Sequence, residues 1–222
     1  MKKLFLLFGF LILQTGYSQT TKDVGTFNSI AVFDKITATL IPSSEHKIEL
    51  SGKGSDEVEL INKNGFLKIK MNLKHTLQGD DVKATVYYTT LDEIIADEGS
   101  FIKAEKTIKN TALKINVKKG GRLSANIESD RVSVKGNTGG ISTLKGKANL
   151  QDIISNSGAE INHKDLQTKQ TEVTVNAGGF AEVKATDLVD AKTRAGGSIR
   201  VYGEPKELRE KNIAGGSVTI VK

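Results

Sequence analysis

Apolar and polar residues alternate along most of the chain, and the alternation is arranged around glycines. Around Gly178, Val173 and Val175 precede the glycine and Ala181 and Val183 follow it, with a polar residue between the members of each pair. A period of two residues is typical of a strand that buries one face. The pattern therefore predicts a β-strand on each side of a glycine corner.

The glycine corner recurs down the C-terminal two-thirds of the chain. Its first glycines are Gly99, Gly120, Gly139, Gly158, Gly178, Gly196 and Gly215. They are separated by 21, 19, 19, 20, 18 and 19 residues, and such a period indicates a stack of similar units. At about 3.3 Å per residue, one unit forms three short strands joined by three corners. We therefore expect an all-β fold, a right-handed parallel β-helix (solenoid) with about nineteen residues per coil.

Glycine suits a tight corner because it adopts positive φ at little steric cost. Two positions before it, three successive coils carry Asn137, Asn156 and Asn176. Asparagine tolerates the left-handed region, and stacked amides can hydrogen-bond from coil to coil. We interpret the glycines and these asparagines as a structural corner column, and a row of ligand-binding asparagines is the alternative.

Other columns predict what fills the interior. On the third side of the coil the apolar candidates are Ile108, Ile127, Leu166, Leu188 and Leu208. His163 stands in an inward column of the second strand. We expect it to be an interior residue rather than a catalytic base or a ligand.

Residues 19–91 alternate as well but lack the serial glycine corners. Asn62-Lys63-Asn64-Gly65 separates two alternating segments and is a hairpin signal. We expect this region to be β-structure that opens and caps the solenoid, with the coils in residues 92–222, so that residues 24–222 form one continuous domain. Residues 204–210 are a short polar excursion, for which a helical turn is one interpretation.

The chain begins with a short basic segment and a ten-residue apolar run, Leu4 to Leu13. As a helix the run would span about 15 Å, half of a bilayer's hydrocarbon core, which favours a signal peptide over a transmembrane anchor. Gly16 and Ser18 are the small residues that cleavage after Ser18 requires. We predict a signal peptide over residues 1–18 and an exported protein that is periplasmic, surface-associated or secreted, without a transmembrane segment.

The amino-acid composition limits the catalytic and metal-binding chemistry that the chain can carry. The chain has no cysteine, which excludes disulfides, thiolate ligands and thiol nucleophiles. His46, His75 and His163 fall in no metal or hydrolase motif, and adjacent carboxylates on a strand point to opposite faces. We therefore predict no catalytic residues, no metal site and no cofactor.

Positive charge is concentrated between residues 103 and 147. Eleven basic residues face only three acidic ones there, Glu105, Glu128 and Asp130. The basic residues are Lys103, Lys106, Lys109, Lys114, Lys118, Lys119, Arg122, Arg131, Lys135, Lys145 and Lys147. Stacked coils could gather them into one ribbon that attracts acidic glycans, lipopolysaccharide phosphates or anionic lipid headgroups. The alternative is that these side chains guard exposed strands against aggregation.

The order of segments resembles a known family. Phe27-Asn28-Ser29-Ile30, Gly65-Phe66-Leu67-Lys68-Ile69 and Leu91-Asp92-Glu93-Ile94 precede the serial Gly-Gly coils. Over roughly residues 26–205 the chain resembles the putative auto-transporter adhesin, head GIN domain family, found among exported proteins of Bacteroidetes-type bacteria. The resemblance implies a β-helical fold and an adhesin-like role, and it implies no catalytic residues.

We therefore expect a non-enzymatic envelope or secreted protein that uses a β-helical face for adhesion or scaffolding. Its expected partners are acidic glycan, lipopolysaccharide or another envelope protein, and the sequence leaves open whether copies of the chain associate. Nucleic acid is disfavoured because the basic residues are not interleaved with aromatic ones. The alternatives are a carbohydrate-active enzyme on acidic polysaccharide and an envelope-stress or signalling accessory protein.

Overall fold

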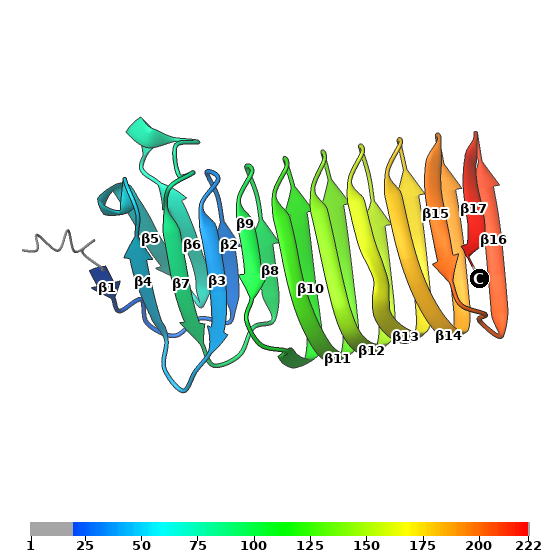
Figure 1. The fold of residues 1–222 in the computed structure, drawn as a ribbon, viewed down its shortest axis with the longest axis horizontal. Helices are drawn as coiled ribbons and strands as arrows, with labels where there is room; N and C mark the ends of the chain where they lie inside the picture. Colours follow the sequence, from blue (N-terminus) through cyan, green and yellow to red (C-terminus); the bar gives the residue numbers. More distant parts are fainter. Residues whose placement is uncertain (1–19, 222) are drawn as a thin grey trace, which may run out of the picture.

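A computed structural model describes residues 20–221 of the chain. It is a parallel β-solenoid of about seven turns with roughly 19 residues per coil, as the glycine spacing predicts. The coils follow one another along a single axis from the N-terminal to the C-terminal end (Figure 1). The predicted signal peptide, residues 1–18, lies outside the described residues.

Within that range the fold comprises seventeen strands and two short 3₁₀ helices. The strands are β1 (Thr20–Lys22), β2 (Ser29–Val32), β3 (Thr37–Pro42), β4 (Lys47–Ser51), β5 (Val58–Lys63), β6 (Phe66–Met71), β7 (Lys83–Tyr88), β8 (Glu93–Ala96), β9 (Phe101–Ala104), β10 (Ile108–Lys118), β11 (Arg122–Asn137), β12 (Ile141–Ser155), β13 (Glu160–Asn176), β14 (Phe180–Arg194), β15 (Gly197–Tyr202), β16 (Glu207–Ile213) and β17 (Gly216–Val221). The 3₁₀ helices are η1 (Ser55–Glu57) and η2 (Leu73–His75).

The glycine corners stack in a line along one edge of the solenoid (Figure 1). At one of them Lys119 and Gly120 have φ of 48° and 75°, and the Gly121 N–H donates to the Lys118 carbonyl at 2.9 Å. Two successive left-handed residues closed by this bond form a two-residue turn of the kind that joins twisted strands. The Gly99 N–H also donates to the Lys119 carbonyl at 3.0 Å, so neighbouring corners bond to each other.

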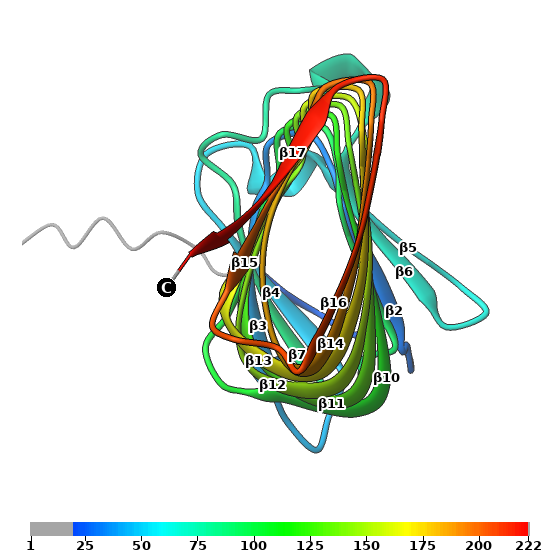
Figure 2. The same cartoon turned by 90° about the vertical axis from the view of Figure 1, so that its right-hand side faces the viewer.

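The sequence predicts two further corners in each coil besides the glycine corner. The structure shows a single broad bend in their place. A single strand such as β11 runs 16 residues from one corner to the next, and its parallel ladder with β12 extends from Arg122↔Ile141 to Gly136↔Ser155. Viewed along the axis, the coils superimpose with a narrow corner at one end and a broad bend at the other (Figure 2). The expectation of three short strands is therefore wrong, because the ladder continues round the bend without a sharp turn.

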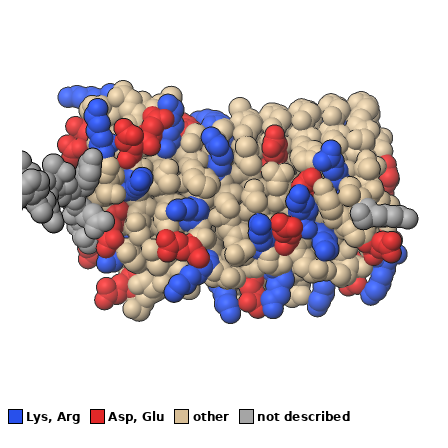
Figure 3. Space-filling view, in the orientation of Figure 1, with Lys and Arg blue, Asp and Glu red and all other residues tan. Residues whose placement is uncertain are grey.

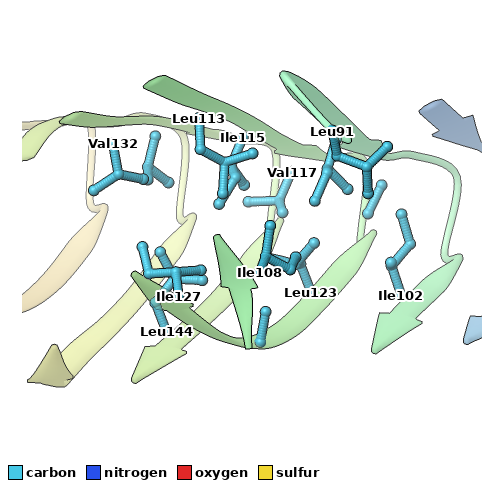
Figure 4. Packing of buried hydrophobic residues seen from close by; sticks show 14 of the residues in the cluster. Leu91, Ile102, Ile108, Leu113, Ile115, Val117, Leu123, Ile127, Val132 and Leu144 are labelled. Atoms are coloured by element: carbon cyan, nitrogen blue, oxygen red, sulfur yellow. The ribbon is translucent and has the colours of Figure 1, made fainter. Parts of the chain in front are cut away.

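Apolar side chains from both halves of each coil fill the interior. Leu113, Ile115 and Val117 project from one side and Leu123 and Ile127 from the other toward a shared core (Figure 4). All five are nearly inaccessible to solvent. Such burial is the main source of stability in a solenoid, because each coil buries its inward face against its neighbours.

One expected core residue faces outward instead. Leu188 pairs with Gln170 and Glu207, and it is only half-buried, whereas the next residue, Val189, is fully buried. Leu208 is partly buried against the core, and Ile108, Ile127 and Leu166 are buried as predicted. Leu188 differs from the prediction because the number of residues at the bend varies between coils. One residue more or less there exchanges the inward-facing and outward-facing positions.

The N-terminal strands do not stack in sequence order. β2 pairs in parallel with both β6 and β8, and β3 pairs with both β7 and β9. The β2–β3 coil therefore lies between the β6–β7 coil and the β8–β9 coil (Figure 1). Antiparallel strands then close this end: β4 pairs with β7, β5 with β6, and β1 with β4. The predicted hairpin signal joins β5 to β6, with Asn64 and Gly65 both left-handed.

The C-terminal end is built from β16 and β17. β16 pairs in parallel with β14, and β17 pairs with β15. Residues 207–210 are strand, so the helical turn considered for residues 204–210 is wrong.

Candidate functional site

A groove runs along the bend, opposite the glycine corners. Its volume is about 630 Å³. It is lined by Lys109, Asn110, Glu128, Ser129, Asp130, Lys147, Ala148, Asn149, Gln167, Thr168, Lys169 and Thr186. These residues come from five successive strands, β10 to β14, so the groove crosses the stacked coils rather than following one of them. We call this surface the bend groove.

The parallel register arranges the lining in columns. Lys109, Glu128, Lys147 and Gln167 are successive partners across β10 to β13. Glu128 lies between two ammonium groups, with its carboxylate 3.0 Å from Lys147 Nζ and 3.4 Å from Lys109 Nζ. The hydrogen bond from Lys147, supported by the charge of Lys109, lowers the pKa of the Glu128 carboxyl. Glu128 is therefore ionised at neutral pH and bridges the two lysines.

Hydrogen bonds hold the neighbouring columns. The Asn149 side-chain amide donates to the Asp130 carboxylate at 2.9 Å. The Ser129 hydroxyl donates to the Arg131 carbonyl at 2.8 Å, and the Thr168 hydroxyl donates to the Lys184 carbonyl at 2.8 Å. The groove thus presents ammonium, carboxylate, amide and hydroxyl groups on a floor fixed by the strand ladder.

The eleven basic residues of the charged segment do not form one ribbon. The strand halves before the corners carry Lys114, Lys118, Arg131 and Lys135, and the strand halves after the corners carry Lys103, Arg122 and Lys145. Lys119 occupies a corner, and Lys106, Lys109 and Lys147 lie at the bend. Residues nineteen apart share a column, but residues within one coil point to different sides.

Six of the eleven have carboxylate partners. Lys118 lies 3.1 Å from the buried Asp97, and Lys119 lies 3.1 Å from Glu98. The remaining pairs are Arg131–Asp152, Lys145–Asp165, Lys109–Glu128 and Lys147–Glu128. Figure 3 shows the same mixing of signs, with charges in the later coils gathered toward the middle and the lower, bend edge. The segment is therefore a mixed-charge surface, and only part of it faces the groove.

The sequence did not reveal several lining residues. Asn149, Gln167, Thr168 and Lys169 lie outside the basic pattern or are uncharged. The repeat is the sequence signal that could have located these residues, because each one is stacked on a groove-lining residue of the preceding coil. The bend varies in residue count between coils, so alignment on the glycines alone blurs these columns.

The corner column is structural in its contacts. The Asn176 side-chain amide donates to the Asn156 side-chain oxygen at 2.7 Å, which is one step of the predicted ladder between coils. Asn137 instead accepts from the Thr138 hydroxyl of its own corner at 3.4 Å. The glycines themselves present backbone on a narrow edge. The pocket that includes Gly99 is shallow and is bordered by Lys35, Leu77 and Lys119.

His163 is buried in the core as expected. Its Nε2 lies 3.0 Å from the Ser142 hydroxyl, and its Nδ1 lies 2.6 Å from the Gln151 amide nitrogen. Burial lowers the pKa of His163 to about 3, so the imidazole is neutral at neutral pH. It has no route to a substrate, and its contacts serve the interior packing.

No group of three or more histidine, aspartate or glutamate side chains converges as a metal site among residues 20–221. In that range no helix is long and apolar enough to cross a membrane. The described surface carries columns of polar side chains that are stacked from coil to coil along the solenoid axis.

The molecule is thus a parallel β-solenoid with a long, repetitive polar surface. It belongs to the family described as "Putative auto-transporter adhesin, head GIN domain", which matches residues 26–205. This confirms the resemblance that the sequence carries.

Solved structures share the fold. A "putative adhesin" from Bacteroides fragilis NCTC 9343 is similar with a TM-score of 0.84 at 18% identity, covering 93% of this chain and 98% of that chain. A "putative adhesin" from Parabacteroides distasonis ATCC 8503 has a TM-score of 0.71 at 20% identity, covering 93% and 97%. A "Putative lipid binding protein" from the same strain has a TM-score of 0.69 at 17% identity, covering 94% and 98%. No curated protein matches this chain.

Proposed function

We propose that this protein is a non-enzymatic, adhesin-like binding module and that its bend groove binds acidic polysaccharide. The observation that carries the proposal is the groove itself, which crosses five strands and is lined by polar side chains in register. The family's description and the "putative adhesin" neighbours support a binding role rather than a catalytic one.

The chemistry of the lining suits a polymer that carries both hydroxyl and carboxylate groups. Lys109, Lys147 and Lys169 can bind carboxylates, and Asn149 and Gln167 can hydrogen-bond hydroxyls through their amides. Because stacked strands repeat about every 4.8 Å, a linear ligand along the axis would meet similar groups from coil to coil. Many weak contacts of this kind add up to useful affinity.

We further propose that the protein is exported through residues 1–18, which supplies the setting in which an adhesin-like module meets glycans. Mass measurement of the protein recovered from the cell envelope or medium tests this. A mass that matches a chain beginning at Gln19 supports export with cleavage, and a full-length mass in the cytoplasmic fraction alone contradicts it.

Replacing the three groove lysines tests the site. The variant Lys109→Gln, Lys147→Gln, Lys169→Gln should weaken binding to heparin or a linear polyuronate roughly tenfold or more, since each lost charge contact is worth up to about 1 kcal/mol. Affinity should also fall as salt rises, because screening weakens exposed charge contacts. Isothermal titration or biolayer interferometry at two salt concentrations provides the measurement.

A matched control removes the same charge elsewhere. Lys103, Arg122 and Lys135 are exposed, lie away from the groove and have no carboxylate partner within 4.0 Å among the described residues. Their triple glutamine variant should bind nearly as well as the unmodified protein. Equal loss in both variants would show that net charge rather than the groove is responsible, and no loss in the groove variant would reject the site.

A gain of binding gives a second readout. Glu128→Gln removes the carboxylate that bridges Lys109 and Lys147 and frees both ammonium groups for the ligand. Binding to the acidic polymer should therefore strengthen, whereas a neutral polysaccharide should show no such gain.

A further inference from the structure

The two ends of the solenoid are finished differently. At the N-terminal end, antiparallel strands β4 and β5 close the stack. At the other end, β16 pairs with β14 and β17 with β15, and within residues 20–221 no strand pairs with their outer edges. β16 and β17 are the last strands of the stack in the described part of the chain (Figure 1). An unpaired strand edge is a template for another strand.

The direction of the backbone shows which residues of β16 are available. The Ala195 N–H donates to the Ile213 carbonyl at 3.1 Å, so the Ile213 carbonyl faces β14. Backbone groups of successive residues in a strand point to opposite sides. Arg209 therefore also faces β14, and Leu208 and Glu210 present their N–H and C=O groups to the open edge.

The side chains of this edge have a self-complementary order. Lys206, Glu207, Leu208, Arg209 and Glu210 read as positive, negative, apolar, positive and negative. When two copies of this segment run antiparallel about Leu208, Glu207 faces Arg209 of the second copy, and Lys206 faces Glu210. Leu208 faces itself. The Glu207 and Arg209 pairs are the contacts on which the register depends, because Lys206 precedes β16 and its ammonium already lies 2.8 Å from Asp187.

We propose that β16 binds β16 of a second copy of this chain as an antiparallel strand pair centred on Leu208. The Leu208 pair supplies two N–H···O=C bonds across the symmetry axis. The flanking Glu207 and Arg209 pairs fall at positions without backbone bonds, where opposing side chains come closest. Within one chain Arg209 Nε lies 2.7 Å from the Glu207 carboxylate, and both side chains remain more than half exposed, at 59% and 54%. In the dimer each of these charges would therefore exchange or share its partner with the second copy.

Charge also excludes the competing registers. Centring the pair on Glu210 would oppose two carboxylates and would place Arg209 against Lys211. Centring it on Arg209 would oppose two guanidinium groups. Like charges directly opposite one another destabilise a strand pair, so the Leu208 register is favoured over its neighbours.

The contact is small, because only a few residues of one strand take part, well below the roughly 1,600 Å² of a standard stable interface. The association is accordingly weak and is expected at high protein concentration. Sedimentation equilibrium of the chain without its first 18 residues, at concentrations up to roughly 1 mM, covers the range in which small interfaces associate.

Arg209→Glu is the decisive variant. It places two glutamates opposite each other on both sides of the axis and should weaken dimerisation about tenfold or more. The double variant Glu207→Arg, Arg209→Glu exchanges the two charges, keeps every opposite pair and should restore dimerisation. Arg122→Glu, which makes the same charge change on an exposed residue of β11, should leave it unchanged.

The outcomes separate cleanly. A dimer that is weakened by Arg209→Glu and recovered by the exchange supports the proposal. A monomer throughout the concentration range would overturn it. A dimer insensitive to Arg209→Glu, or one that the exchange fails to restore in a protein with unchanged thermal unfolding, would place the contact elsewhere and overturn it as well.

Discussion

At the residue scale, neighbouring coils pack together because a smaller side chain in one coil faces a larger one in the next. Most corners carry a second glycine, but Ala159 takes that place in one coil. The residue it meets in the preceding coil is Gly136, whose column holds Val117 and Val175 in other coils. A Cβ added to Gly136 would lie 2.8 Å from the Ala159 Cβ. The missing side chain of Gly136 therefore makes room for Ala159.

This fit predicts a coupled pair of substitutions. Gly136→Ala should lower the free energy of unfolding by roughly 1–3 kcal/mol, the usual cost of overpacking. Adding Ala159→Gly should recover part of that loss, because the remaining close contact is with the movable end of Ile161. Urea unfolding of both single variants and the double variant measures the coupling, and additive losses would contradict the proposed fit.

His163 makes stability depend on pH. Burial lowers its pKa to about 3 in the folded chain, whereas an exposed histidine has a pKa near 6.5. Below about pH 6.5 the unfolded chain binds a proton that the folded chain does not, so its contribution to stability is full above that pH and falls as pH falls toward 3. The slope is about 1.4 kcal/mol per pH unit.

Substitution isolates this contribution. His163→Gln keeps a neutral polar group near Ser142 and Gln151 but removes the titration. The stability difference between the unmodified chain and this variant should therefore shrink as the pH is lowered from 7 to 4. A difference that stays constant over that range, measured by urea unfolding, would show that His163 is not held neutral.

At the element scale, the repeated strands were predictable from the sequence and the N-terminal order was not. Glycine spacing and two-residue alternation are local signals, and they correctly placed the corner between β11 and β12. The position of β2 and β3 between the β6–β7 and β8–β9 coils depends on pairing over long sequence separations. Nothing in the local alternation of residues 24–42 encodes that choice.

The bend was missed for a related physical reason. A long strand can curve without a glycine or proline if its ladder continues, so no turn residue marks the position in β11. In β12 a register shift between Thr143 and Lys145 and the left-handed Gly146 provide the curvature. Because the bend also lines the groove, most of the candidate site lay outside the sequence prediction, which identified Lys109 and Lys147 but assigned them to a wider basic ribbon.

At the scale of the whole molecule, stacking turns single side chains into columns. Glu128 lies between Lys109 and Lys147 because the three residues are ladder partners in three successive coils. The proposed glycan groove and the proposed pairing of β16 both depend on this register, one along the side of the stack and one at its end. The proposals are otherwise independent, since the groove lies on β10 to β14.

Disulfide trapping tests the register most directly, because the chain contains no cysteine to compete. Ser124 and Thr143 are direct partners in the β11–β12 ladder, and Asn162 follows Thr143 in the next coil. Stacked partners lie about 4.8 Å apart, within the Cα range of a disulfide, and residues two coils apart lie at about twice that distance. Ser124→Cys with Thr143→Cys should oxidise readily within one chain, and Ser124→Cys with Asn162→Cys should keep free thiols. Free thiols in the first variant, or efficient bridging in the second, would contradict the stacked solenoid.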